Sequence, residues 1–212
     1  MSTEEGEIVK RMFQIRAFLD EFIVEGIGPQ LENIGFSRKG KNTLTRKHGE
    51  CYQEVYILFR RLTGQEAGYI QVFIAIRFDA VEKLSFELQG ETPRKKWPTA
   101  SLNIGNLQEK REFIEWRLDE KTDISALSLI VMDWISRYAF PLWESFSTIP
   151  TLLQGYLSKD PRLLLNGSYE WRLAAAYRHN GQTDEAIRVL EEWNKGRPAE
   201  NMIEKAVERL RE

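Results

Sequence analysis

The sequence predicts an α+β fold, in which an antiparallel meander of about five strands is packed by N-terminal and C-terminal helices and followed by an α-helical tail. Residues 51–78 are the densest run of β-branched and aromatic residues, and they alternate with the period of two that strands show. Residues 5–25 and the stretch from Asp123 onward carry apolar side chains three and four positions apart, as amphipathic helices do. The connections between the predicted strands are short, which favours antiparallel pairing.

Residues 51–78 are expected to form a hairpin, with residues 63–68 and their two glycines as its loop. Both faces of this hairpin carry apolar side chains, so we expect one face to be covered fully and the other in part. Residues 43–47, 101–104 and 111–118 are the other predicted strands. Residues 80–89 fit a short helix or a strand, because periodicity cannot decide over so few positions.

Two helices are expected to flank the sheet. The first covers residues 5–25 and is ended or kinked by Gly26 and Gly28-Pro29. The second is capped by Thr122 or Asp123 and stops at Phe140-Pro141, since proline lacks the amide donor.

The amino-acid composition indicates where the protein is located and which kinds of metal and disulfide site it can form. One cysteine, Cys51, excludes an intrachain disulfide, and with two histidines in the chain it leaves too few ligands for a typical zinc site. A cytoplasmic location is expected, because the N-terminus is acidic where a signal peptide is basic, and no apolar run approaches the roughly 18 residues of a membrane span. The net charge of -2 provides no global attraction for nucleic acid or for anionic membranes.

Residues up to about 149 carry a series of short motifs in a fixed order. Gly35-Phe36, Arg38-Lys39-Gly40, Ile104-Gly105-Asn106-Leu107, Trp116 and the helix from Asp123 follow one another. This series resembles a family of uncharacterised bacterial domains that open with a helix, run an antiparallel meander and close with a helix. The resemblance implies a fold and a bacterial origin, and it brings no catalytic residues with it.

The C-terminal segment shows a different spacing of its apolar, small and turn residues. The residues that carry it are Leu173, Ala174, Tyr177, Gly181, Ala186, Leu190 and Pro198. They fall within a period of about 34 residues, and the segment is similar to a tetratricopeptide repeat, although Trp193 stands where that repeat has alanine. One repeat cannot bury its own apolar faces, so this hairpin must pack on the main domain or on another chain. We therefore divide the chain into an α+β domain (residues 1–149), a helical linker (150–167) and a tetratricopeptide-like tail (168–212).

No catalytic constellation stands out, and the sequence indicates no cofactor and no metal ion. Cys51 lies near His48 and Glu50, but neighbours in a turn do not align a thiolate with a base and an orienting group, so a plain buried cysteine is favoured. His179 is expected to cap a helix end. Adjacent carboxylates such as Asp119-Glu120, Glu191-Glu192 and Glu4-Glu5 point apart rather than toward one substrate. Trp97, Trp116, Trp134 and Trp143 are expected to pack in the core rather than to line a ligand pocket.

One stretch has a surplus of positive charge interleaved with tyrosines. The candidate binding surface consists of Arg38, Lys39, Lys47, Tyr52, Tyr56, Arg60 and Arg61. Such a composition fits a nucleic-acid surface, a contact for an anion or an acidic protein, or a solvated edge strand.

Three functions follow as hypotheses. The first is a non-catalytic cytosolic protein-binding module, such as an immunity-type or adaptor protein, with another protein as its partner and no membrane contact. The second is a small-molecule-binding protein or an enzyme with a pocket between the sheet and the helix from Asp123. The third is nucleic-acid binding through the basic strand edge, with an affinity that falls steeply with salt.

Overall fold

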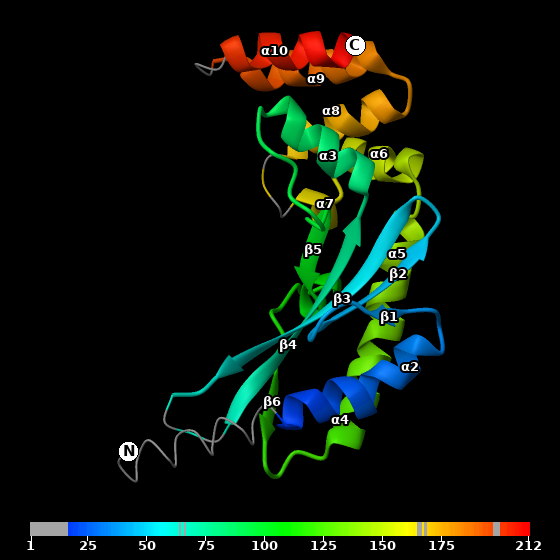
Figure 1. Cartoon of the computed structure of the whole chain (residues 1–212), viewed down its shortest axis with the longest axis vertical. Coiled ribbons are helices and arrows are strands. Elements are labelled where there is room, and N and C mark those ends of the chain that lie inside the picture. Colours follow the sequence, from blue (N-terminus) through cyan, green and yellow to red (C-terminus); the bar gives the residue numbers. More distant parts are fainter. Residues whose placement is uncertain (1–16, 64, 66, 165–166, 168, 197–199) are drawn as a thin grey trace. The chain divides into compact units, whose positions relative to one another are not determined.

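The computed structural model describes residues 17–63, 65, 67–164, 167, 169–196 and 200–212 (Figure 1). Residues 5–16 of the first predicted helix lie outside the described residues, and so do the pair Glu4-Glu5 and Pro198 of the predicted repeat. Within the described part of the chain, no helix has the length and the apolar character that crossing a membrane requires.

The described strands form one six-stranded antiparallel sheet. They are β1 (Ser37–Arg38), β2 (Thr43–His48), β3 (Cys51–Arg61), β4 (Ala67–Arg77), β5 (Ala100–Asn103) and β6 (Trp116–Asp119). Their order in the sheet is β1-β2-β3-β4-β5, and β6 pairs with β4 in the register Ile70 opposite Trp116. The predicted α+β meander with helices after the sheet is therefore confirmed.

The helices lie between the strands and after them. They are η1 (Phe22–Ile27), α2 (Gly28–Glu32), α3 (Asp79–Leu88), η2 (Ile104–Leu107), α4 (Ile124–Trp134), η3 (Ile135–Ala139), α5 (Phe140–Ser145), α6 (Ile149–Leu157), α7 (Pro161–Leu164), α8 (Tyr169–His179), α9 (Thr183–Asn194) and α10 (Glu200–Arg211). The ambiguous residues 80–89 are helical, because Val81, Phe86 and Leu88 are buried together with Glu82 and Ser85 at helical spacing.

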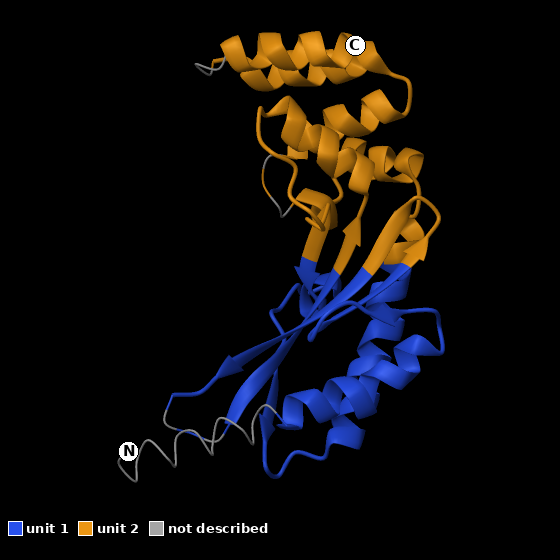
Figure 2. Cartoon of the chain, viewed as in Figure 1, with its two compact units in different colours: residues 1–46, 54–74, 102–142 blue, residues 47–53, 75–101, 143–212 orange. Residues whose placement is uncertain are grey.

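The chain divides into two compact units, each assembled from three stretches (Figure 2). Unit 1 contains residues 1–46, 54–74 and 102–142, and unit 2 contains residues 47–53, 75–101 and 143–212. Strands β2, β3, β4 and β5 each contribute residues to both units. The predicted division of the chain at residues 149 and 167 stays a prediction.

In unit 1, helices cover one face of the sheet. Val55 and Ile57 of β3 are fully buried, as are Ile70, Val72 and Ile74 of β4. Figure 1 shows α2 and α4 on the same side of these strands, and the Trp134 ring of α4 meets the Trp116 ring of β6 edge to face with centroids 5.9 Å apart. The covered face is therefore the apolar core of this unit.

Gly26 is required for the contact between η1 and α4, because a Cβ added there would lie 2.1 Å from Ser128 Oγ. The predicted end or kink at Gly26 and Gly28-Pro29 is a π-helical turn that leads directly into α2.

The predicted stop at Phe140-Pro141 is wrong, since the helix continues through η3 into α5. A proline ring clashes with the carbonyl four residues earlier. The wider π turn, in which Phe140 N–H donates to Ile135 O, accommodates the proline without ending the helix.

The side chain of Asn103 makes hydrogen bonds to the backbone of Ile114 that a neighbouring strand would otherwise make. Its Oδ1 accepts from Ile114 N at 2.9 Å and from Gly105 N at 3.0 Å, and its Nδ2 donates to Ile114 O at 2.9 Å. Because both backbone groups of Ile114 are taken, the strand predicted over residues 111–118 begins only at Trp116. A Cβ on Gly105 would lie 2.1 Å from Glu112 O, so glycine is needed in this turn.

In unit 2, the tail packs on helices of the same chain. Helix α8 lies against α3, α6 and α9, and α10 lies against α9 and α3. The alanines of α8 and Ala186 of α9 are fully buried, so these helices approach closely. Trp193 of α9 packs against Trp171 of α8, with their ring centroids 5.1 Å apart.

Asn103→Ala is expected to lower the free energy of unfolding by about 2–3 kcal/mol, because it removes three hydrogen bonds and leaves the backbone of Ile114 without these partners. Urea denaturation measures the change. Asn106→Ala in the same turn is the matched control and should change stability by less than about 0.5 kcal/mol. Equal losses in the two variants would contradict the role given to Asn103.

Candidate functional site

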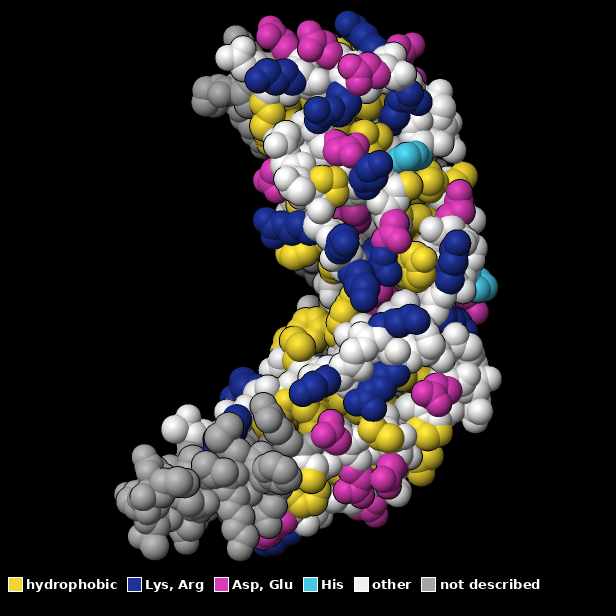
Figure 3. Space-filling model, viewed as in Figure 1, with side chains coloured by type: hydrophobic (Ala, Val, Ile, Leu, Met, Phe, Trp, Pro, Cys, Tyr) yellow, Lys and Arg dark blue, Asp and Glu magenta, His cyan; other side chains and the backbone are white. Residues whose placement is uncertain are grey.

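The sheet of unit 1 has a second face that none of the helices described in the structure covers. Since strand side chains alternate, the residues between the core positions of β3 and β4 point to this face together with the segment before β6. We call it the open sheet face, and it consists of Tyr56, Leu58, Arg60, Tyr69, Gln71, Phe73, Phe113 and Glu115. Leu58 is 48% exposed and Phe113 is 52% exposed. Figure 3 shows hydrophobic side chains exposed among charged ones on the surface of the molecule.

A hydrogen-bonded network of Arg60, Gln71 and Glu115 lies on the open sheet face beside its apolar side chains. Arg60 donates to Glu115 Oε1 at 2.5 Å, and Gln71 donates to Glu115 Oε2 at 3.0 Å. The Arg60 guanidinium also lies 4.7 Å from the centroid of the Tyr69 ring. The hydrogen bond from Arg60 and the one from Gln71 hold the pKa of Glu115 below its ordinary value. This network fixes polar groups between the exposed apolar side chains.

The cations of the predicted binding surface have different surroundings. Arg38 donates to the carbonyls of Gly40 at 3.2 Å and Lys41 at 3.0 Å, so it closes the loop between β1 and β2, where Lys39 is exposed. Arg61 is exposed at the end of β3, next to Arg60 with its partner Glu115.

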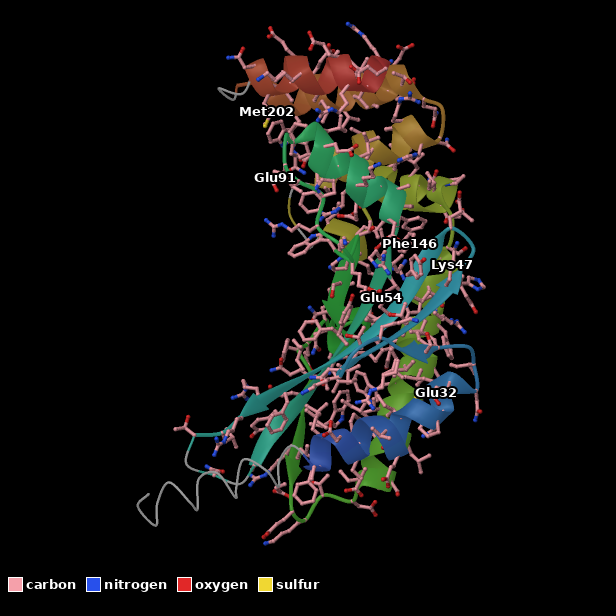
Figure 4. The ribbon with its side chains drawn as sticks, in the orientation of Figure 1. Glu32, Lys47, Glu54, Glu91, Phe146 and Met202 are labelled. Carbon is pink, nitrogen blue, oxygen red and sulfur yellow. The ribbon has the colours of Figure 1, made fainter. Side chains whose placement is uncertain are left out.

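Three more residues of the predicted surface lie on β2 and β3. Lys47 belongs to unit 2 and is exposed at the end of β2, as Figure 4 shows. Tyr52, also in unit 2, lies beneath Arg77 at 4.2 Å from guanidinium carbon to ring centroid. Tyr56, in unit 1, donates to the buried carboxylate of Glu54. Several of the predicted contact groups therefore already have partners within the chain.

Cys51, His48 and Glu50 are engaged separately. The Cys51 thiol is buried and donates to His48 O at 3.3 Å, so it contacts the backbone of the histidine. Glu50 accepts from Ile149 N at 2.8 Å at the start of α6. His179 Nε2 lies 3.1 Å from Ala80 O, which joins the end of α8 to the start of α3. Among the residues that the structure describes, no group of three or more His, Cys, Asp and Glu side chains is placed to hold a metal ion.

Unit 2 contains a cleft of about 260 Å³ beside α3, which we call the Trp97 cleft. Its lining residues are Glu82, Ser85, Phe86, Gln89, Arg94, Trp97, Pro98, Gly167 and Arg172. Arg172 of α8 donates to Glu82 Oε1 of α3 at 2.9 Å and to Gly167 O at 3.1 Å. The side chains of this ion pair are 9% and 4% exposed, respectively, so the pair forms a buried floor.

Trp97 belongs to the rim of this cleft. Its side chain is 41% exposed, so the prediction that it packs in the core is wrong. Trp143 is fully buried and donates to Ala75 O at 3.0 Å, as a core tryptophan does. The difference has a basis in sequence, because Trp97 lies in a proline-flanked, lysine-rich loop without periodicity. Nothing in the sequence indicated that Glu82 and Arg172, which are 90 positions apart, line the same cleft.

Two polar atoms near the floor of the Trp97 cleft have unusual surroundings. Among the described residues, Glu82 Oε2 and the Tyr156 hydroxyl are buried without a hydrogen-bond partner. Burial raises the pKa of Glu82, and the opposing effects of Arg172 and Thr99 are smaller. Burial also raises the pKa of Tyr156, which therefore remains neutral. The floor is electrostatically balanced but incompletely hydrogen-bonded.

Comparisons of the chain with protein-family models, with curated proteins and with solved structures found no match. The candidate sites therefore rest on the geometry of the chain itself.

Glu82→Gln should change the pH dependence of stability. A raised pKa means that the folded state holds the carboxyl proton of Glu82 more tightly than the unfolded state does. The stabilisation is therefore fully present below pH 4.5, the ordinary pKa of the side chain, and it is lost as the pH rises through the raised pKa. The free energy of unfolding of the wild type, relative to that of Glu82→Gln, should fall between pH 4.5 and neutrality. Denaturant titrations of both proteins at several pH values measure it. A difference that stays constant or grows with pH would contradict this expectation.

Tyr156→Phe is expected to leave stability unchanged or to raise it, because the lost hydroxyl has no partner among the described residues. Trp143→Phe is the comparison, since it removes a buried hydrogen bond to Ala75 O and leaves a space in the core. It should cost about 2 kcal/mol or more. Thermal and urea unfolding give both values, and a loss above about 1 kcal/mol in Tyr156→Phe would mean that the hydroxyl is satisfied.

Proposed function

We propose that this protein is a non-catalytic protein-binding module and that the open sheet face of unit 1 is its contact surface. The observation that carries the proposal is the exposure of Leu58 and Phe113 beside the hydrogen-bonded Arg60–Glu115 pair. Buried aromatic and arginine anchors supply most of the energy in protein interfaces, and the buried centre of an interface is more apolar than the rest of the surface. The open sheet face offers aromatic, arginine and apolar side chains on a rigid sheet.

Burying the exposed apolar side chains of this face would supply part of the binding free energy. Fully burying one leucine or phenylalanine side chain contributes roughly 1.5–3 kcal/mol. Leu58 and Phe113 are about half exposed, and Phe73 supports Phe113 through an edge contact at 6.3 Å between ring centroids. The hydrogen bonds of Glu115 keep Arg60 and Gln71 in place before a partner arrives, which lowers the entropic cost of association.

The charges of the open sheet face support a protein partner over nucleic acid. Arg60 is paired with Glu115 at 2.5 Å, and the neighbouring Arg117 is paired with Asp119 at 2.8 Å. Nucleic-acid binding draws its affinity from cations that replace counterions on phosphates. Paired cations serve this purpose poorly. The partner that fits is a nearly neutral protein surface with an apolar centre.

The alternative of a ligand pocket between sheet and α4 has less support. The side chains on that face, such as Ile70, Val72 and Ile74, are fully buried. A cytosolic adaptor or an immunity-type protein in a bacterium is the setting that we propose, because a single buried thiol suits a reducing compartment.

Site-specific photocrosslinking in the native host tests the contact surface. p-Benzoylphenylalanine replaces Phe113 on the open sheet face, Leu129 on the exposed side of α4, or Glu32 on α2. One protein adduct of defined mass should form at position 113 and be absent at positions 129 and 32. An adduct at 129 alone, a dimer of the chain itself, or a nucleic-acid adduct would overturn the proposal.

Leu58→Asp then measures the affinity for the recombinant partner found by crosslinking. Binding should weaken roughly tenfold or more, because a charge enters the apolar centre of the interface. Leu157→Asp is the matched control, since Leu157 is similarly exposed on α6 in unit 2. Calorimetry of both variants gives the dissociation constants. Equal affinities would show that the open sheet face is not the contact surface.

A further inference from the structure

We propose that the Trp97 cleft of unit 2 is a binding site for a planar anionic small molecule. The ring of this molecule would stack on Trp97, and its anionic group would meet Arg94. The site is independent of the open sheet face, because its lining residues all belong to unit 2.

An aromatic platform forms the wall of the cleft. The Arg94 guanidinium lies 5.0 Å from the Trp97 ring centroid and 5.6 Å from that of Phe86. The rings of Trp97 and Phe86 meet edge to face at 6.4 Å, and Phe86 is buried, so the partly exposed indole is held from behind. Because Arg94 lies over one face of the indole, a planar group would stack on the other face.

The backbone of the loop is held in a conformation that presents Trp97. Lys96 has a φ of 58°, in the left-handed region that non-glycine residues rarely adopt. Such a conformation costs roughly 1–3 kcal/mol and persists only where the surrounding structure maintains it. Trp97, which follows Lys96, packs on Phe86 and Arg94.

The loop that contributes Arg94 and Trp97 to the cleft carries an excess of positive charge. Arg94, Lys95 and Lys96 are exposed in the segment 91–97, where Glu91 is the one carboxylate. Glu91 lies 4.0 Å from Arg94, and both side chains are more than half exposed, so this pair is weak. Figure 4 shows Glu91 in the loop that follows α3. An incoming anion can therefore compete with Glu91 for Arg94.

The floor of the cleft is neutral and polar. Glu82 compensates the charge of Arg172, so neither residue repels or attracts a ligand as a free charge. Gln89 donates to Ser85 O at 2.9 Å, which fixes the amide along the wall. A volume of about 260 Å³ suits one or two fused rings with a single charged group, so a small molecule fits better than a polymer.

Two sources share this ligand chemistry, namely nucleotides and aromatic carboxylates. Thermal-shift and fluorescence titrations of the full-length protein use adenosine monophosphate, uridine monophosphate and indole-3-carboxylate as probes. Adenosine and inorganic phosphate represent the ring and the anion alone. At least one planar anion should raise the melting temperature and bind saturably, more tightly than adenosine or phosphate.

Variants assign the binding to the cleft. Arg94→Gln and Trp97→Ala should each weaken binding roughly tenfold or more, whereas Trp97→Phe keeps a stacking ring and should stay within a few-fold of the wild type. Arg188→Gln is the matched control, because Arg188 is another exposed arginine of unit 2 with a carboxylate, Glu185, at 3.9 Å. It should bind as the wild type does.

The proposal is overturned if no planar anion binds at millimolar concentration, or if Arg188→Gln weakens binding as much as Arg94→Gln. It is also overturned if an RNA oligomer or an acidic peptide binds while none of the small anions does. A negative result for the Trp97 cleft would not affect the proposal for the open sheet face, since Leu58→Asp and the crosslinks report on unit 1.

Discussion

The one-sided covering of the sheet in unit 1 is the constraint on which the account depends. β3 and β4 carry apolar side chains on both faces, but α2 and α4 lie on one side of these strands, and Ile70, Val72 and Ile74 are fully buried. The other face keeps Leu58 and Phe113 about half exposed. A pair of strands with two apolar faces needs two covers. None of the described helices covers the second face, and the proposed cover is another protein.

Polar groups determine how each unit presents its surface. In unit 1, Glu115 fixes Arg60 and Gln71 within an apolar surround, and Asn103 holds the segment before β6 by its backbone. In unit 2, the buried pair of Glu82 and Arg172 joins α3 to α8 and forms the floor beneath Trp97. Breaking a buried pair is costly because the remaining charge has no counterion. Both candidate surfaces therefore rest on side chains that are fixed in advance.

The sequence predicted elements that follow local rules. Alternation in residues 51–78 predicted β3 and β4, and Asp123 caps α4 by accepting from Ala126 N at 2.9 Å. The stop at Pro141 failed because a π turn absorbed the proline, which depends on the surrounding packing. The Trp97 cleft was missed because it joins residues 82 and 172, and no pattern within one segment reports such a contact. Pairing of Arg60 with Glu115, 55 positions apart, was hidden for the same reason.

Hydroxyl-radical footprinting of the protein in its native host, compared with the purified chain, tests the proposed cover most directly. We expect Leu58, Tyr69 and Phe113 to be labelled in the purified protein and protected in the host. Leu129 on α4 and Leu157 on α6, which are also exposed, should be labelled equally in both. Equal labelling of Leu58 and Phe113 in the two settings would contradict the claim that a protein covers the open sheet face.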